Sequence, residues 1–126
     1  MKLAFIGTGK IIADALFAVE PIKEIEKTAI FARPHSKEKA EAFAKQYNIA
    51  EVYTDYEKLL TETAADTVYI GLINSAHYSY AKQALLHGKN VILEKPFTGF
   101  YNEAQELQQI AEENKLFIFL HSSFSN

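Results

Sequence analysis

Two glycines near the N-terminus stand where a protein chain can bind a phosphate group. Gly7-Thr8-Gly9 directly follows an apolar run and opens a segment with the apolar spacing of a helix. The first glycine permits a tight turn, and the second lets the backbone approach a diphosphate, which then meets the N–H groups that begin the helix. The predicted diphosphate-binding residues are Gly7, Thr8, Gly9, Lys10 and Ile11. The alternative is a strand-to-helix turn that merely tolerates glycine.

The third position of this glycine fingerprint holds Ile12, where glycine or alanine is usual. A larger side chain at this position is expected to push the helix off the sheet or to narrow the diphosphate channel, and Ala13 is expected to relieve the crowding. The departure lowers the expected tightness of dinucleotide binding and leaves the expected fold unchanged.

The second apolar strand ends in a cation. In an NAD-binding unit a carboxylate closes this strand and accepts from the ribose 2′-hydroxyl, but this chain has Arg33 at that point. Arginine pairs with a 2′-phosphate through its fork of donors, and His35, Ser36 and Lys37 are close enough to add donors. We therefore expect NADP in preference to NAD. The alternative is that Arg33 is a solvated residue at a strand end.

The fifth strand runs directly into Glu94-Lys95-Pro96. Ligands of open α/β sheets bind beyond the carboxyl ends of the strands, so both charged side chains are candidates for a cofactor or substrate site. A lysine ammonium can donate to a hydroxyl or carbonyl oxygen and stabilise charge there. The alternative is an ordinary surface ion pair, with the proline ending the strand.

Short apolar runs alternate with segments of helical period along the whole chain. Strands that are apolar on consecutive residues are typical of parallel sheets covered on both faces. The pattern predicts a doubly wound α/β Rossmann sheet of six parallel strands in the order 3-2-1-4-5-6, as one domain over residues 1–121 with a short polar tail at 122–126. The expected strands are Leu3–Ile6, Thr28–Ala32, Glu51–Tyr53, Thr67–Leu72, Asn90–Leu93 and Leu116–Leu120. Ser36 and Thr54-Asp55 are predicted to begin helices, and Gly88 to end one.

Composition excludes several functions. The net charge of −3 gives no basic face for nucleic acid, and the absence of cysteine removes disulfides, thiolate catalysis and cysteine-based zinc sites. The four histidines have no metal-ligand spacing, so no metal is expected. No apolar run is long enough to cross a bilayer and the N-terminus does not read as a signal peptide, so we expect a cytoplasmic protein without a membrane partner.

Taken together, these motifs resemble the nucleotide-binding half of the glucose–fructose oxidoreductase / inositol dehydrogenase / MocA (Gfo/Idh/MocA) family of NAD(P)-dependent oxidoreductases. The resemblance covers Lys2 to about Leu120, and its most specific part is Glu94-Lys95-Pro96 after the fifth strand. The other matching segments are Ala4–Gly9, Ala32-Arg33 with the helix Lys37–Tyr47, Asn74–His77 and Gly88–Leu93.

The resemblance implies roles for particular residues. Lys95 corresponds to the family lysine near the nicotinamide and the substrate hydroxyl, and is the one predicted catalytic residue. Glu94 is implied to lie near the nicotinamide ribose. Leu72, Asn74 and His77 are implied to stand at the cofactor side of the fourth strand. For His77 the alternative is a side chain that caps or packs the start of its helix.

The resemblance also implies a sugar, polyol or related hydroxy compound as substrate, held largely by a second α+β domain that follows in family members. We expect the present 126 residues to bind the dinucleotide with little or no turnover by themselves. The alternatives are a stand-alone dinucleotide-binding or sensing module and a degenerate protein-interaction domain. Without the second domain, exposed aromatic side chains are expected to favour a homo-oligomer. The candidates are Phe97, Phe100, Tyr101, Phe117, Phe119 and Phe124.

Overall fold

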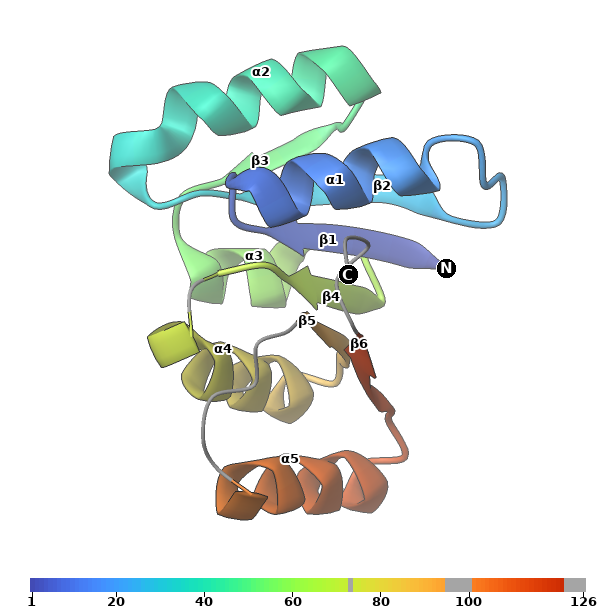
Figure 1. Ribbon diagram of the computed structural model, residues 1–126, viewed down its shortest axis with the longest axis vertical. Coiled ribbons are helices and arrows are strands. Elements are labelled where there is room, and N and C mark those ends of the chain that lie inside the picture. The colour runs from blue at the N-terminus through green and yellow to red at the C-terminus, as the bar shows by residue number, and fades with distance from the viewer. Residues whose placement is uncertain (73, 95–100, 122–126) are drawn as a thin grey trace.

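The computed structural model describes residues 1–72, 74–94 and 101–121, in which strands and helices alternate (Figure 1). The strands are β1 (Lys2–Ile6), β2 (Glu26–Phe31), β3 (Glu51–Tyr53), β4 (Thr67–Ile70), β5 (Asn90–Glu94) and β6 (Ile118–His121). The helices are α1 (Lys10–Val19), α2 (Lys37–Tyr47), α3 (Tyr56–Glu62), α4 (Asn74–Leu86) and α5 (Tyr101–Glu113), with a 3-10 turn η1 (Pro34–Ser36) before α2.

All six strands form one parallel sheet in the order β3-β2-β1-β4-β5-β6, which confirms the predicted fold and strand order. Strand β1 lies in the middle, and every residue of it after Lys2 is buried. All four residues of β4 are buried as well. Runs of consecutive apolar residues therefore mark strands that helices cover on both faces.

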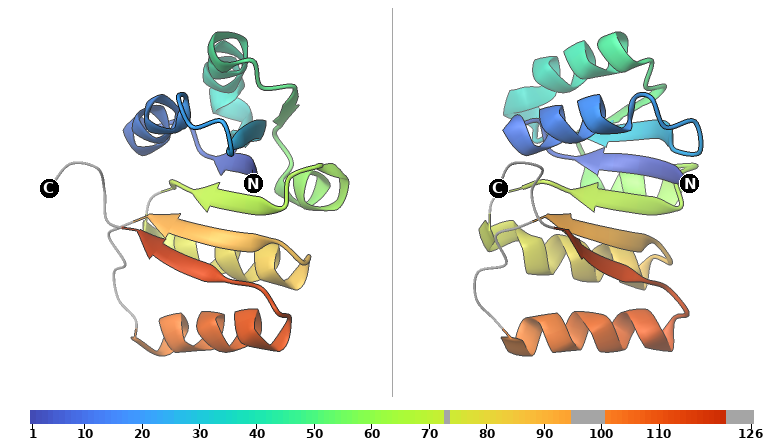
Figure 2. Two further views of the ribbon diagram at one scale, coloured as in Figure 1. Left: turned by 90° about the vertical axis from the view of Figure 1, so that its right-hand side faces the viewer. Right: turned by 45° about the vertical axis from the view of Figure 1, so that its right-hand side comes forward.

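Successive residues of each strand face opposite layers of helices. In β1, Phe5 packs with Ile12 and Leu16 of α1, whereas Ile6 belongs to the cluster that includes Leu59 of α3. Helices α1 and α2 supply one layer, and α3, α4 and α5 supply the other. In the left view of Figure 2, α1 and α3 lie on opposite sides of the sheet. This two-layer cover is the doubly wound arrangement.

Within the described part of the chain, the first layer covers the strands unequally. One row of paired residues crosses the sheet on the α1 face from Phe5 through Tyr69 and Ile92 to Phe119. Phe5 is fully buried, Tyr69 is 4% exposed, Ile92 is half-buried and Phe119 is 54% exposed. Exposure therefore rises along this row toward the edge strand β6.

Several boundaries differ from the sequence prediction for local reasons. Strand β6 begins at Ile118 instead of Leu116, because Lys115 takes a left-handed conformation (φ 58°) and the Leu116 N–H still bonds the Ala111 carbonyl of α5. Asp55 is the residue that caps α3, accepting from the Lys58 N–H at 3.2 Å. Ser36 does precede α2, but its side chain makes no capping bond. Gly88 follows α4 at φ 79°, as its predicted stop requires.

The turn from β1 to α1 contains two glycines with different demands. Gly7 has φ 121°, and a Cβ there would lie 3.2 Å from the Gly71 carbonyl oxygen and 3.3 Å from a Leu72 methyl carbon. Gly9 is the N-cap of α1 with an extended backbone, and a Cβ there would meet nothing within 4 Å. The fold itself thus requires glycine at position 7 and not at position 9.

Across the described part of the chain, no helix has the length and apolar character of a membrane span.

These glycines give a paired prediction about folding. We expect Gly7→Ala to lower the free energy of unfolding by about 2 kcal/mol, because it combines a disfavoured φ with two close contacts. We expect Gly9→Ala to change it by less than about 1 kcal/mol, since lost N-cap preference and reduced chain entropy largely cancel. Urea denaturation of the ligand-free protein measures both. Equal losses from the two changes would contradict this assignment.

Candidate functional site

The carboxyl ends of three strands come level at one edge of the sheet. Ile6 at the end of β1 pairs with Phe31 of β2 on one side and with Ile70 of β4 on the other. The strand order reverses here, because β2 and β3 lie on one side of β1 whereas β4, β5 and β6 lie on the other. Open α/β sheets bind ligands in the crevice beyond such a switch point.

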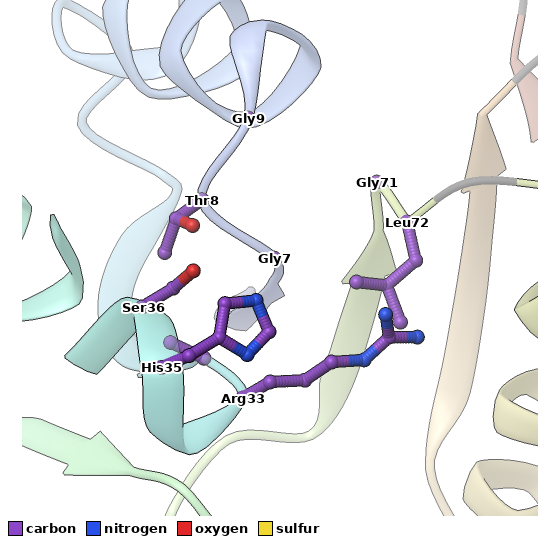
Figure 3. A pocket seen from close by; sticks show the side chains of 9 residues that line it. Gly7, Thr8, Gly9, Arg33, His35, Ser36, Gly71 and Leu72 are labelled. Carbon is purple, nitrogen blue, oxygen red and sulfur yellow. The ribbon is translucent and has the colours of Figure 1, made fainter.

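A pocket of about 190 Å³ lies at this edge (Figure 3). Its lining comes from the β1–α1 turn, the end of β2 with η1, and the end of β4: Gly7, Thr8, Gly9, Ala32, Arg33, His35, Ser36, Gly71 and Leu72. Sites for drug-sized ligands usually measure roughly 300–1,000 Å³, so this pocket accommodates only part of a dinucleotide.

The glycine turn provides the anion-binding wall of the pocket. The N-cap of α1 is Gly9, which has no side chain to bond the first turn, and that turn contains no acidic residue, so the leading N–H groups can meet an anion. The space beside Gly9 is open. A side chain at position 9 would project into that space, and glycine leaves it for a ligand. The turn therefore fits a diphosphate group, as the fingerprint predicts.

A polar arm from β2 provides the opposite wall. Arg33 is exposed and leads into η1, which carries His35 and Ser36. Figure 3 shows the Arg33 side chain reaching across the pocket toward Leu72, while the Ser36 and Thr8 hydroxyls turn into the same space. None of the nine described lining residues is acidic, so the wall favours an anion.

The predicted ligand residues at the starts of α1 and α2, which are Lys10, Ile11 and Lys37, lie outside the lining. Lys10 bonds Asp14 along α1 at 2.8 Å, and Lys37 lies 3.9 Å from Glu41 along α2. Both ammonium groups are thus engaged within their own helices. The Ile11 side chain packs against the core cluster beneath α1. Lys10 and Ile11 can still reach the pocket through their backbone N–H groups at the helix start.

His77 secures the end of β4. It is 6% exposed, and its Nε2 lies 2.6 Å from the Leu72 carbonyl oxygen, which accepts and so fixes the proton on Nε2. Burial lowers the pKa of His77, against the opposing effects of this hydrogen bond and the Glu94 charge. His77, which the family resemblance places at the cofactor side of β4, thus donates to the backbone of Leu72, a residue that lines the pocket. Asn74 is the first residue of α4.

Glu94 ends β5 as a fully buried carboxylate that accepts from the hydroxyl of Tyr69 on β4. Burial, the hydrogen bond and the charge of Glu94 together raise the pKa of Tyr69 far above its ordinary value, so the phenol keeps its proton. The predicted catalytic Lys95 lies outside the described residues.

Sequence reasoning missed two residues here. Tyr69 lies in an apolar strand, where an aromatic side chain indicates a core residue, so its hydrogen bond to Glu94 was not predicted. Gly71 lines the pocket and also provides the room for Ile12, a role that had been expected of Ala13. A glycine directly after a buried strand was the available signal for the second.

The chain matches a family model described as "Oxidoreductase family, NAD-binding Rossmann fold" (GFO_IDH_MocA) over residues 1–122. Among curated proteins it is 32% identical over 123 residues to a trans-1,2-dihydrobenzene-1,2-diol dehydrogenase of Xenopus laevis, covering 98% of this chain and 37% of that protein. It is 32% identical over 114 residues to a scyllo-inositol 2-dehydrogenase (NADP(+)) of Bacillus subtilis, covering 90% and 34%.

Solved structures agree. A 3-ketoreductase from Actinomadura kijaniata in complex with TDP-benzene and NADP aligns with a TM-score of 0.85 and 31% identity over 94% of this chain and 37% of its own. An oxidoreductase from Agrobacterium radiobacter in complex with NAD+, L-tartaric acid and magnesium has the same fold, with a TM-score of 0.87 and 23% identity over 96% and 35%.

The chain thus spans about a third of the length of these relatives. The match over residues 1–122, the strand order and the glycine turn at the switch point agree with one another. The chain belongs to the Gfo/Idh/MocA oxidoreductase family, of which it is the NAD(P)-binding Rossmann domain.

Proposed function

We propose that this domain binds NADP in preference to NAD, with the diphosphate on the Gly7–Gly9 turn and the adenosine ribose beside Arg33. The observation that carries the proposal is the open space at Gly9, which is the N-cap of α1 and has no side chain to bond the N–H groups that begin the helix. A methyl group at position 9 would clash with no protein atom, so we infer that glycine at this position leaves room for a ligand.

The preference for the 2′-phosphate rests on charge. The arm that faces the glycine turn holds Arg33, His35 and Ser36, and no carboxylate among the described lining residues would repel a phosphate. Arg33 forms no ion pair among those that the described residues make. Its guanidinium is therefore available to take a phosphate bidentately, with Ser36 adding a hydroxyl donor.

The relatives suggest the chemistry of the whole enzyme. Those described above are named as a dihydrodiol dehydrogenase, an inositol dehydrogenase and a 3-ketoreductase, so we propose a sugar, polyol or related hydroxy compound. When bound, the dinucleotide supplies a nicotinamide that exchanges a hydride with the carbon bearing the substrate oxygen. We propose that Lys95 hydrogen-bonds that oxygen and stabilises its charge, and that Glu94 lies near the nicotinamide ribose.

We further propose that these 126 residues bind the dinucleotide but turn over little by themselves. The pocket lies at one edge of the sheet and forms only one side of an active-site cleft. Hydride transfer needs the substrate to be held against the nicotinamide and shielded from water. A steady-state assay across sugars and polyols that finds family-like turnover with this chain alone would refute the proposal.

Binding itself is tested by thermal and urea unfolding with NADPH, NADH and ADP-ribose. A ligand present at a hundred times its Kd should raise the free energy of unfolding by about 2.7 kcal/mol. We expect Gly9→Ala to abolish most of this gain while leaving the ligand-free stability nearly unchanged, because its methyl group enters the open space. A chain that none of the three ligands stabilises is no dinucleotide binder, which would favour a protein-interaction domain.

The cofactor preference is tested by Arg33→Ala. Loss of a charge-assisted contact with the 2′-phosphate should weaken NADPH by about tenfold to a hundredfold, since such bonds contribute about 1.5–3 kcal/mol. NADH should change by no more than about threefold on the same scale. Lys39→Ala removes an equal charge from an exposed position in α2 outside the pocket and serves as the control. Equal losses of NADPH and NADH on calorimetric titration would refute the assignment.

We also propose self-association through the edge strand β6. Phe117, Phe119 and Leu120 are 41%, 54% and 47% exposed, and exposed apolar patches on an edge strand promote pairing between chains. We expect Phe119→Ser to lower the association constant in sedimentation equilibrium. Phe17→Ser is the matched control, because Phe17 is 76% exposed on α1 and should contribute little. If the parent protein remains monomeric at high concentration in sedimentation equilibrium, the proposal is wrong.

A further inference from the structure

Gly71, the first residue after β4, is in contact with helix α1 of the other half of the fold. A Cβ built there would lie 2.7 Å from Cδ1 and 2.9 Å from Cγ1 of Ile12, and 3.2 Å from Cγ2 of Ile11. The first two distances are shorter than real carbon contacts allow. The absence of a side chain at position 71 is therefore what admits the isoleucine at position 12.

Ile12 cannot easily give way. It is fully buried and packs in the cluster with Phe5 and Leu16, where a shift of one methyl group has to displace neighbours. If position 71 carried a side chain, the helix would have to move as a body or the end of β4 would have to retreat. Either movement changes the distance between α1 and the sheet edge.

The same residue touches the glycine turn. The Gly71 N–H donates to the Ile6 carbonyl at 3.0 Å, and the Gly71 carbonyl oxygen lies 3.2 Å from the point where a Cβ of Gly7 would stand. Gly71 also lines the pocket opposite Arg33 (Figure 3). One residue thus contacts the turn, the helix that follows it and the pocket.

We propose that Gly71 is a positioning residue for the dinucleotide: with Ile12 it sets how closely the N-terminus of α1 approaches the end of β4, and so places the N–H donors that meet the diphosphate. The inference rests on the proposed dinucleotide binding. The fingerprint usually has a small residue at position 12 of the helix. In this chain the larger Ile12 fits there because position 71, at the end of β4, carries no side chain. The two positions form a complementary pair whose sizes must change together.

The test is a cycle of four proteins: the parent, Gly71→Ala, Ile12→Ala and the double variant. NADPH affinity is measured by calorimetry on samples shown by circular dichroism to be folded. We expect Gly71→Ala to raise Kd by about tenfold or more. We expect the double variant to bind within about threefold of Ile12→Ala, because the new methyl group occupies space that the isoleucine has left.

Leu107→Ala is the control for general destabilisation. Leu107 is buried in α5, in the other core layer and outside the pocket lining, so its loss should lower stability without raising Kd. A Gly71→Ala protein that binds as tightly as the parent, or a double variant that recovers nothing relative to Gly71→Ala, would overturn the inference.

A second readout separates this inference from the proposed function. In the ligand-free protein, the backbone amide resonances of Gly7, Thr8, Gly9 and Lys10 should shift in Gly71→Ala and return toward the Ile12→Ala positions in the double variant. If the parent binds no dinucleotide, the proposed function fails while these shifts still decide whether Gly71 sets the turn. Unmoved amide resonances would overturn the positioning role whatever the binding result.

Discussion

Two backbone hydrogen bonds beyond the end of β1 hold the candidate site together. Gly7 donates to the Phe31 carbonyl of β2 at 2.9 Å, and Gly71 donates to the Ile6 carbonyl of β1 at 3.0 Å. They extend the ladders one residue past the assigned strands on both sides of β1. Three chain segments are thereby fixed level with one another where the sheet stops, and the glycine turn, the Arg33 arm and the end of β4 can line one pocket. A parallel sheet makes this convergence unavoidable, because all its strands end at the same edge.

The general plan of the fold could be predicted because its causes are local or periodic. Consecutive apolar residues in β1 and β4 predict buried parallel strands, and the stripe of Ile12, Leu16 and Val19 predicts a helix lying on them. The site wall at Gly7–Gly9 was also predictable, since a glycine turn between a strand and a helix has a specific physical use. The Arg33 arm followed from the absence of a carboxylate at the end of β2.

What could not be predicted depends on contacts between residues distant in sequence. Ile12 and Gly71 are 59 positions apart, and only the packed structure shows that the size of one is matched to the absence of a side chain in the other. Tyr69 and Glu94 lie on neighbouring strands, and no periodicity indicates that a phenol in a buried strand bonds a carboxylate. Closeness in sequence can also mislead. Lys37 is near Arg33 in sequence, but in α2 its ammonium lies toward Glu41 and outside the pocket lining.

Local charge at the pocket differs in sign from the charge of the chain. The chain carries a net charge of −3, which in water exerts little force beyond about 8–10 Å at physiological ionic strength. Within the pocket, the turn that begins α1 and Arg33 line the same space, with no acidic lining residue among those described. An anion between them interacts with both at short range, where screening is weakest. The arrangement therefore suits a ligand with negative charge at two separated points, one at the glycine turn and one beside Arg33, which is what the proposed preference for NADP requires.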